Sequence, residues 1–585
     1  MKKGFLIVLI LCAFNVFSQK KNNEKAKDTL KTEVVEVVTT YNPKIADANK
    51  LKNNPSVKLL EKTKKQPLKY NIFSVPVAST FVPKSGVVKG IDVGLKERIY
   101  DNFIAAGFGN YTSPYFETFL HKHTRFKSEF GLSARYNASF DNIANTVLNS
   151  HFSNFGASVF YKQDERYFDW KVTLNSERNQ YNWYGITPNS LAINSLNSIE
   201  ENQTYNYFNV DGEIDLLDSY IDKSNFSFSY FSDVFNSSEF LVSLDTDLDI
   251  PISFIRKNLK INTKIEYLNG EFLNNYSNTN KLNYSIFTAK INPEYNNTFN
   301  GFSVKLGAKV FASLDGKNRI NNFLVYPDIK IQKEILKENL QVYGGVSGDL
   351  KTNNYRDFSE DNPFVSPTIF ITQTAEKMNA FLGFSGVLNK SVSFNVSASF
   401  KNEQDKPLFL KNNSKSDGIS TSANGINFRG YEYGNSFGIV YDDVKTSSFF
   451  AEMSYEFSKQ ITFETNFQID SFNTTTEVEA WNLPIFQGNL IAKYMNEKWY
   501  ATSTILFIGN RKDALYASNY PSNDKTSLTI PSFFDLNLNG GYFFNDKFSA
   551  FLKINNLLNN NYQRFANFEV QGFQILGGVT CKFDF

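Results

Sequence analysis

Apolar and polar residues alternate strictly over segments of roughly nine to fourteen positions, from about Ile99 to the end of the chain. In one segment the even positions form a largely apolar face: Phe126, Ser128, Phe130, Leu132, Ala134, Tyr136, Ala138 and Phe140. The odd positions between them carry Lys127, Glu129 and Arg135. A period of two predicts β-strands with two different faces. Soluble sheets use strands of about 5–6 residues, whereas a tilted strand that crosses a bilayer needs about 9–11. The pattern therefore predicts membrane-spanning strands.

The same alternation returns at 259–267, 302–310 and 461–469, and the connections between strands are of two kinds. Short turns at 458–460 and 545–547 contrast with long polar stretches at 182–203, 403–435 and 510–530. Short turns at one end and long loops at the other are typical of outer-membrane barrels. Closure is required because hydrocarbon leaves no partner for an unpaired backbone edge. We predict an all-β fold, a transmembrane antiparallel β-barrel of about 22 strands over residues 99–585. A soluble sandwich would have shorter strands and fewer aromatic residues than the 16% found here.

Composition and motifs exclude other classes. The mean hydropathy is −0.35 and no apolar run after residue 20 is long enough for a spanning helix. A net charge of +2 provides no field for nucleic acid. Nucleotide-binding, nucleophile-elbow and zinc-protease motifs are missing from the sequence. We therefore expect neither an enzyme nor a cofactor.

Residues 1–18 resemble a secretory signal peptide, with Lys2 and Lys3 before a short apolar core. Cleavage before Gln19 would leave Cys581 as the one cysteine, so no disulfide forms within a copy. Residues 19–98 are predicted to be a periplasmic tether. They are rich in lysine, and they include a short extended run from Thr32 to Thr40. The lysine excess is typical of a solvated tether, or of contact with anionic lipid or a periplasmic partner.

The C-terminal strand has the most specific pattern. One face is predicted to carry Phe573, Ile575, Val579, Cys581, Phe583 and the terminal Phe585. We expect this strand to be recognised by the barrel-assembly machinery and its apolar face to contact outer-membrane lipid.

The segment from Ser532 to Phe585 resembles the closing segment of TonB-dependent receptors. It runs Asp535-Leu536-Asn537-Leu538, then Asn555-Asn556-Leu557-Leu558 with Tyr562, and ends in the glycine-containing strand that finishes in Phe. The sequence departs from the family at Leu576-Gly577-Gly578, where members carry an arginine. The resemblance implies a receptor in the outer membrane of a Gram-negative bacterium.

A TonB box is implied at Glu33, Val34, Val35, Glu36, Val37, Val38 and Thr39. A TonB-type energy-coupling protein would capture such an extended segment by adding a strand to it. Family members place a globular plug domain between box and barrel. Only about 60 residues separate Thr40 from Asn102 here, so the resemblance is to a barrel-only relative without a full plug. Such a barrel has room for an aqueous channel unless the tether or the long loops fill it.

Individual side chains give weaker indications. His121 and His123 share a strand face, but no third ligand is identifiable, so we predict no metal. Asp245, Asp247 and Asp249 alternate with apolar residues and are predicted to form an acidic stripe facing the lumen. A second set of predictions concerns aromatic residues. Trp481 and Trp499 fit interfacial girdles, whereas Tyr431 and Tyr433 are aromatic loop residues that either pack locally or stack on a ligand.

Three functions remain open from the sequence. The first is a receptor or transporter that takes up an unidentified solute, similar to TonB-dependent receptors. The second is a passive diffusion channel without a plug. The third is a structural or assembly barrel that docks other envelope proteins.

Overall fold

The computed structural model describes residues 100–124, 127–252, 257–336 and 339–585. The predicted signal peptide, the tether and the TonB-box-like residues lie outside these ranges. Within them, 22 strands form one sheet. In chain order they are β1 (Asn102–Gly109), β2 (Ser113–His123), β3 (Ser128–Ser139), β4 (Phe152–Asp164), β5 (Phe168–Asn182), β6 (Asn202–Leu216), β7 (Ile221–Asp233), β8 (Ser238–Ile252), β9 (Lys257–Phe272), β10 (Leu282–Phe299), β11 (Phe302–Asp315), β12 (Ile320–Leu336), β13 (Leu340–Thr352), β14 (Gln373–Leu388), β15 (Val392–Lys411), β18 (Phe437–Ser458), β19 (Ile461–Thr474), β20 (Phe486–Met495), β21 (Trp499–Ile508), β24 (Phe533–Phe543), β25 (Phe548–Asn555) and β28 (Gln574–Phe583).

The sheet closes on itself because its first and last strands are paired. β28 pairs antiparallel with β1, from Asn102 opposite Phe583 to Gly109 opposite Leu576, and also with β25. Each other barrel strand pairs antiparallel with the barrel strands before and after it in the chain, as in β1 with β2. No edge strand is left in this sheet, which satisfies the backbone in hydrocarbon. The predicted fold class and strand number are confirmed.

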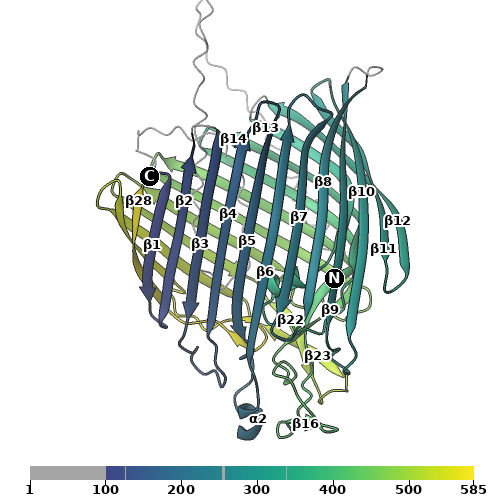
Figure 1. The fold of residues 1–585 in the computed structure, drawn as a ribbon, viewed down its shortest axis with the longest axis vertical. Coiled ribbons are helices and arrows are strands. Elements are labelled where there is room, and N and C mark those ends of the chain that lie inside the picture. The colour runs from purple at the N-terminus through teal and green to yellow at the C-terminus, as the bar shows by residue number, and fades with distance from the viewer. Residues whose placement is uncertain (1–99, 125–126, 253–256, 337–338) are drawn as a thin grey trace, which may run out of the picture. The chain divides into compact units, whose positions relative to one another are not determined.

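The two ends of the barrel differ in the length of their connections. At one end, near the C-terminus, the connections have at most four residues. At the other end, long connections run over 183–201, 353–372, 412–436, 509–532 and 556–573. Figure 1 shows this loop end with α2, β16, β22 and β23. The described elements that do not belong to the wall are the helices α2 (Ile193–Asn197) and α3 (Tyr355–Asp361) and the small strands β16 (Ser422–Ala423), β17 (Ile426–Asn427), β22 (Arg511–Tyr516), β23 (Lys525–Ile530), β26 (Gln563–Phe565) and β27 (Phe568–Glu569).

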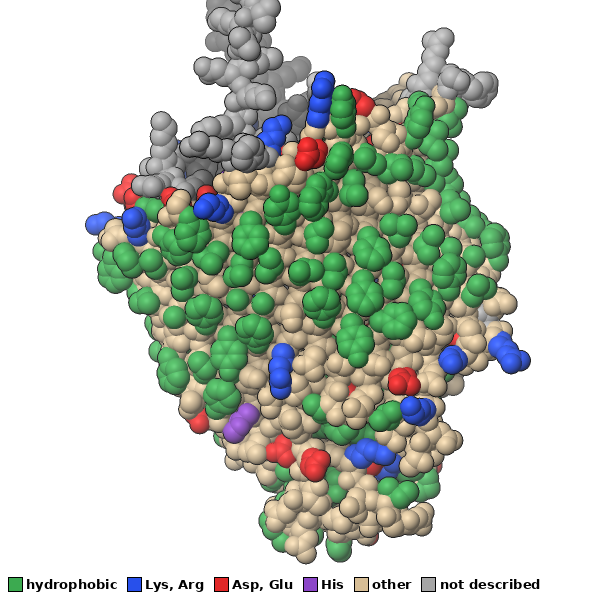
Figure 2. Space-filling model, in the orientation of Figure 1, with side chains coloured by type: hydrophobic (Ala, Val, Ile, Leu, Met, Phe, Trp, Pro, Cys, Tyr) green, Lys and Arg blue, Asp and Glu red, His purple; other side chains and the backbone are tan. Residues whose placement is uncertain are grey.

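The outer wall is apolar, as the alternation predicts. Phe130, Leu306 and Leu382 are exposed large hydrophobic residues on three different strands. On the face shown in Figure 2, hydrophobic side chains cover the wall in a broad band, and charged side chains gather mostly toward its two ends. Such a band fits the hydrocarbon layer of a bilayer. None of the helices in the described ranges is long and apolar enough to cross a membrane.

Candidate functional site: a loop inside the barrel

The connection between β13 and β14, residues 353–372, leaves the wall and packs inside the ring of strands. Its helix α3 begins after Asn354, whose side chain accepts a 2.7 Å hydrogen bond from the backbone N–H of Asp357. This is an N-cap, which satisfies one free donor of the first turn. The helix is short, so its position depends on tertiary contacts rather than on its own stability. We call residues 353–372 the lumen loop.

Tyr355, the first residue of α3, anchors the lumen loop in the wall. Its side chain is fully buried among aromatic rings of β6, β7 and β9. The ring centroids of Phe272, Phe231 and Tyr205 lie 4.9, 5.2 and 6.0 Å from that of Tyr355, all in edge-on geometry. Edge-on aromatic pairs add to the gain from burial. The contact therefore fixes one end of the loop against the inner face.

Two buried carboxylates bind the same residue. Asp233 Oδ2 accepts a 2.8 Å hydrogen bond from the Tyr355 hydroxyl. Glu239 accepts from the backbone N–H groups of Tyr355 at 2.7 Å and Arg356 at 3.2 Å, and from the Tyr284 hydroxyl at 2.7 Å. The wall is thus complementary to the first turn of α3.

The lumen loop reaches two separate parts of the ring. Phe358 packs on Phe409 of β15 at 6.0 Å, and the Ser366 N–H donates a 2.8 Å bond to the carbonyl of Phe437, the first residue of β18. These strands lie on the ring far from β6 to β9, where Tyr355 is held. A segment that contacts both regions crosses the inside of the barrel.

Aromatic side chains from four connections meet over the loop end of the lumen. They form one buried cluster, which we call the aromatic roof: Trp183, Phe364, Tyr431, Phe437, Phe565 and Phe568. Phe364 of the lumen loop stacks on Phe568 with centroids 3.8 Å apart. The side chain of Asn435 donates a 2.8 Å bond to the Trp183 carbonyl, which joins two loops through a polar contact. The roof and the lumen loop together form one packed body at this end.

A cavity of about 220 Å³ lies beneath the roof. Strands β1, β2, β25 and β28 line one side, while Tyr184, Phe364 and Arg564 line it from the loops. Burial lowers the pKa of Arg564 to about 10, which leaves its guanidinium charged at neutral pH. Lys553 of β25 adds a second cationic group, and Asp535 and Glu360 add carboxylates. The cavity therefore presents both signs of charge together with aromatic faces.

The acidic residues predicted to line the lumen lie on the same face of β8 as Glu239, which contacts the lumen loop. Asp245 and Asp247 both accept hydrogen bonds from the Asn262 side chain, at 2.6 and 2.8 Å. Asp249 continues the alternation two residues further. Leu244, which directly precedes Asp245, is exposed on the outside. That the three aspartates line a lumen path stays a prediction.

In the terminal strand, Ile575 and Val579 are exposed, and Cys581 is a half-buried free cysteine. Phe585 is exposed at the chain end. The alternate residue Leu576 packs in a buried cluster with Phe551. Ile575 and Val579 therefore lie on the outer side of the wall, opposite Leu576.

The girdle prediction for Trp481 is wrong, whereas Tyr431 and Tyr433 pack locally, which is one of the two predicted alternatives. Trp481 is buried among loop residues, and its indole N–H donates a 2.8 Å bond to Glu477, so it belongs to no girdle. Tyr431 lies inside the aromatic roof and Tyr433 is also buried, so neither is available for stacking on a ligand. Trp499 is 54% exposed at the short-turn end of β21, as a girdle residue would be.

Sequence reasoning missed the lumen loop. The sequence does indicate that a strand ends there. The alternation stops at Asn353, and two prolines, Pro363 and Pro367, interrupt a largely apolar run. It also missed Asp101, which the structure brings next to His121 and His123.

No protein-family model matches the sequence, and a search of curated proteins gives no match. Solved structures do resemble the barrel. The siderophore receptor PirA from Acinetobacter baumannii is 12% identical, with a TM-score of 0.59 over 82% of this chain and 80% of that chain. The FrpB iron transporter from Neisseria meningitidis is 10% identical, with a TM-score of 0.62 over 83% and 82%. The ferripyoverdine receptor of the outer membrane of Pseudomonas aeruginosa is 12% identical, with a TM-score of 0.59 over 83% and 72%.

The described chain is thus a closed 22-stranded antiparallel barrel with an apolar outer wall and one of its own loops inside. This is the fold of the TonB-dependent outer-membrane receptors. The resemblance that the C-terminal segment predicted is confirmed at the level of the fold.

Proposed function

We propose that this chain is a gated receptor and transporter of a Gram-negative outer membrane, with its ligand contacts at the loop end of the barrel. The observation that carries the proposal is the lumen loop, held at Tyr355 on one side and at Phe437 on the other. A passive pore needs a continuous wet passage, whereas this lumen is crossed by a packed segment. A lumen loop that must move before a solute can pass fits a gated receptor better than a passive pore.

Ferric chelates are the first solute class to test, because proteins of the same fold include a siderophore receptor and an iron transporter. The cavity under the roof supports a solute that carries charge and flat rings, since Arg564, Lys553 and Tyr184 line it. Energy coupling would act through a TonB-type protein on the segment Glu33–Thr39, which lies outside the described residues.

The test is uptake of radioactive iron chelates by cells that carry the intact chain or a chain lacking residues 32–40. Uptake lost in the deletion supports coupled transport. Uptake that is equal in both chains contradicts it and favours passive diffusion. No uptake in either, with partner proteins recovered in stoichiometric amounts after purification in mild detergent, favours the assembly barrel.

A further inference from the structure

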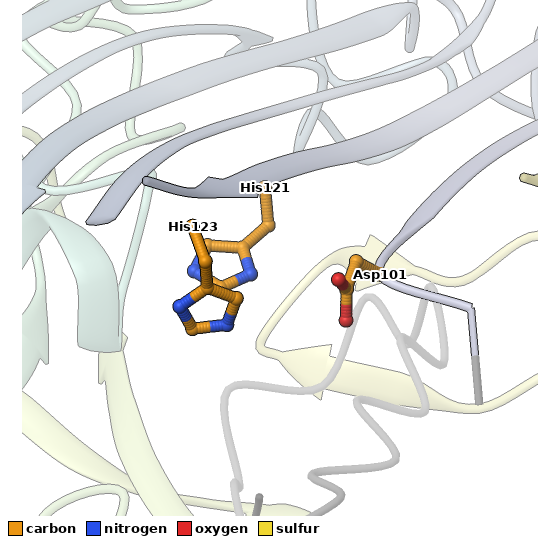
Figure 3. Close-up of side chains that lie close together, drawn as sticks. All are labelled: Asp101, His121 and His123. Carbon is orange, nitrogen blue, oxygen red and sulfur yellow. The ribbon is translucent and has the colours of Figure 1, made fainter. Parts of the chain in front are cut away.

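Three side chains from two neighbouring strands meet at the short-turn end of the lumen. Asp101 immediately precedes β1, and His121 and His123 end β2. One possible ligand atom from each lies within 4.8 Å of the other two. Figure 3 shows the Asp101 carboxylate facing the two imidazole rings. Both histidines lie on the same face of β2, and the carboxylate belongs to the residue directly before the neighbouring strand β1.

Strand register produces this meeting. β1 and β2 pair Phe103 with Phe119, so two further steps put Asp101 opposite His121. The backbone N–H of His121 donates a 2.7 Å bond to the side chain of Asn102. The backbone N–H of Asp101 donates a 2.9 Å bond to Asp584. The closure of the barrel therefore holds Asp101 in place.

Glu129 of β3 approaches both imidazoles. It is the register partner of His123. Its carboxylate oxygens lie 3.6 Å from His121 Nε2 and 3.4 Å from His123 Nδ1. A carboxylate behind a metal-binding histidine orients the ring and raises its basicity. Glu129 holds this position for both rings at once.

The His121 ring is also fixed by packing. Its side chain is only 13% exposed and stacks between Phe119 and Phe160, with both centroids 6.0 Å away. Phe160 can reach it because Gly131 stands between them, where a Cβ would come within 2.0 Å of the Phe160 ring. A ring held in this way loses little freedom on binding a ligand.

We propose that Asp101, His121 and His123 bind a divalent transition-metal ion of the zinc type, with Glu129 as the positioning residue. Two imidazoles and a carboxylate are a zinc donor set, at about 2.0–2.2 Å from the metal. Calcium and magnesium prefer all-oxygen sites. Three protein ligands leave one coordination position for water. The bound ion ties Asp101, the residue at which the N-terminal segment joins the barrel, to β2.

The test is a calorimetric titration of the tag-free full chain, in detergent, with Zn²⁺. We expect one Zn²⁺ per chain. The substitutions His123→Asn and Asp101→Ala should each weaken binding more than tenfold, and Glu129→Gln should weaken it about 10–100-fold. His151→Asn is the matched control, because it removes the remaining histidine of the chain and should leave binding unchanged.

Substitution with Co²⁺ supplies a second measurement that does not depend on affinity. The visible spectrum of the intact chain should show the intense bands of a four-coordinate nitrogen and oxygen site, and the double variant His121→Asn, His123→Asn should lack them. The proposal is overturned if the double variant, shown to be folded by its gel mobility before heating, binds Zn²⁺ as the intact chain does. It is also overturned if the intact chain binds no stoichiometric Zn²⁺, or binds Ca²⁺ as tightly.

Discussion

The hydroxyl of Tyr355 donates a 2.8 Å hydrogen bond to Asp233 across 122 residues of sequence, inside a ring of strands. This bond joins a residue of the lumen loop to the wall at the end of β7. Both residues are buried, so the bond is shielded from water and expensive to leave unmade. The lumen loop is therefore docked by specific contacts rather than lying loosely in a wet channel.

Substitution of Tyr355 by Ala should release the lumen loop. Loss of a buried aromatic side chain costs about 3–5 kcal/mol, and Asp233 would lose a donor as well. We expect protease cleavage within 353–372 of the folded protein to become much faster, as measured by mass spectrometry of the fragments. Tyr220→Ala removes an exposed aromatic residue and should change nothing. Equal protection of 353–372 in both variants would contradict the docking.

Docking of α3 should be stronger at pH 5 than at pH 7. Burial raises the pKa of Glu360 to about 6, although half of its side chain still reaches lumen water and Arg356 opposes the shift. Glu177 of β5 faces it and adds to the increase. An acid with a raised pKa binds its proton more tightly in the docked state. The stabilisation of the docked loop by protonated Glu360 is therefore present at low pH and is lost as the pH rises through about 6.

Current recordings in planar bilayers would measure this effect as the frequency of brief openings. We expect fewer openings at pH 5 than at pH 7 in the intact chain, and a smaller difference in Glu360→Gln. Asp524→Asn, an exposed loop acid, should keep the full difference. A pH response that is unchanged in Glu360→Gln would show that other groups cause it.

A charge on the outer wall should be costly. Leu306 is inside β11, four residues from its start at Phe302, and is 47% exposed on the outer face. Leu306→Arg should destabilise the barrel in lipid by about 2–4 kcal/mol, as measured by equilibrium unfolding in vesicles. Gln332→Arg, on the inner face of the paired strand β12, should cost much less. Equal costs for the two substitutions would argue against a lipid-facing outer wall.

The acidic stripe should control ion selectivity once the lumen is open. In a chain lacking residues 354–371, replacing Asp245, Asp247 and Asp249 by Asn should lower the preference for cations over anions. The effect should fade at high salt because charges are then screened over a few ångströms. Reversal potentials under a salt gradient provide the measurement. An unchanged preference would mean that the stripe does not face the ion path, and Asp417→Asn at a loop tip is the control.

Much of the wall could be predicted because each strand's pattern is local and the bilayer enforces it. Phe130 is 46% exposed outside while its neighbour Glu129 reaches the histidines inside, as alternation requires. The interior could not be predicted in this way. Glu239 meets Tyr355 across 116 residues, and the meeting depends on how a long loop packs once the barrel is closed. Asp101 likewise reaches His121 only through strand register.

The burial of aromatic residues in the loops could not be predicted for the same reason. Trp481 and Tyr431 are residue types that are common in girdles and binding surfaces. Both are nevertheless buried in clusters formed by connections that are distant in sequence. Aromatic residues in loops bury large areas when several loops converge. A single sequence does not show which loops converge.

Single-channel conductance of the purified barrel tests the central claim most directly. The recordings would compare the intact chain with a chain in which a short glycine-serine linker replaces residues 354–371, each with and without residues 19–98. We predict almost no steady current while the lumen loop is present, and a large steady current once it is removed. A large steady current through the chain that keeps its lumen loop would contradict the account.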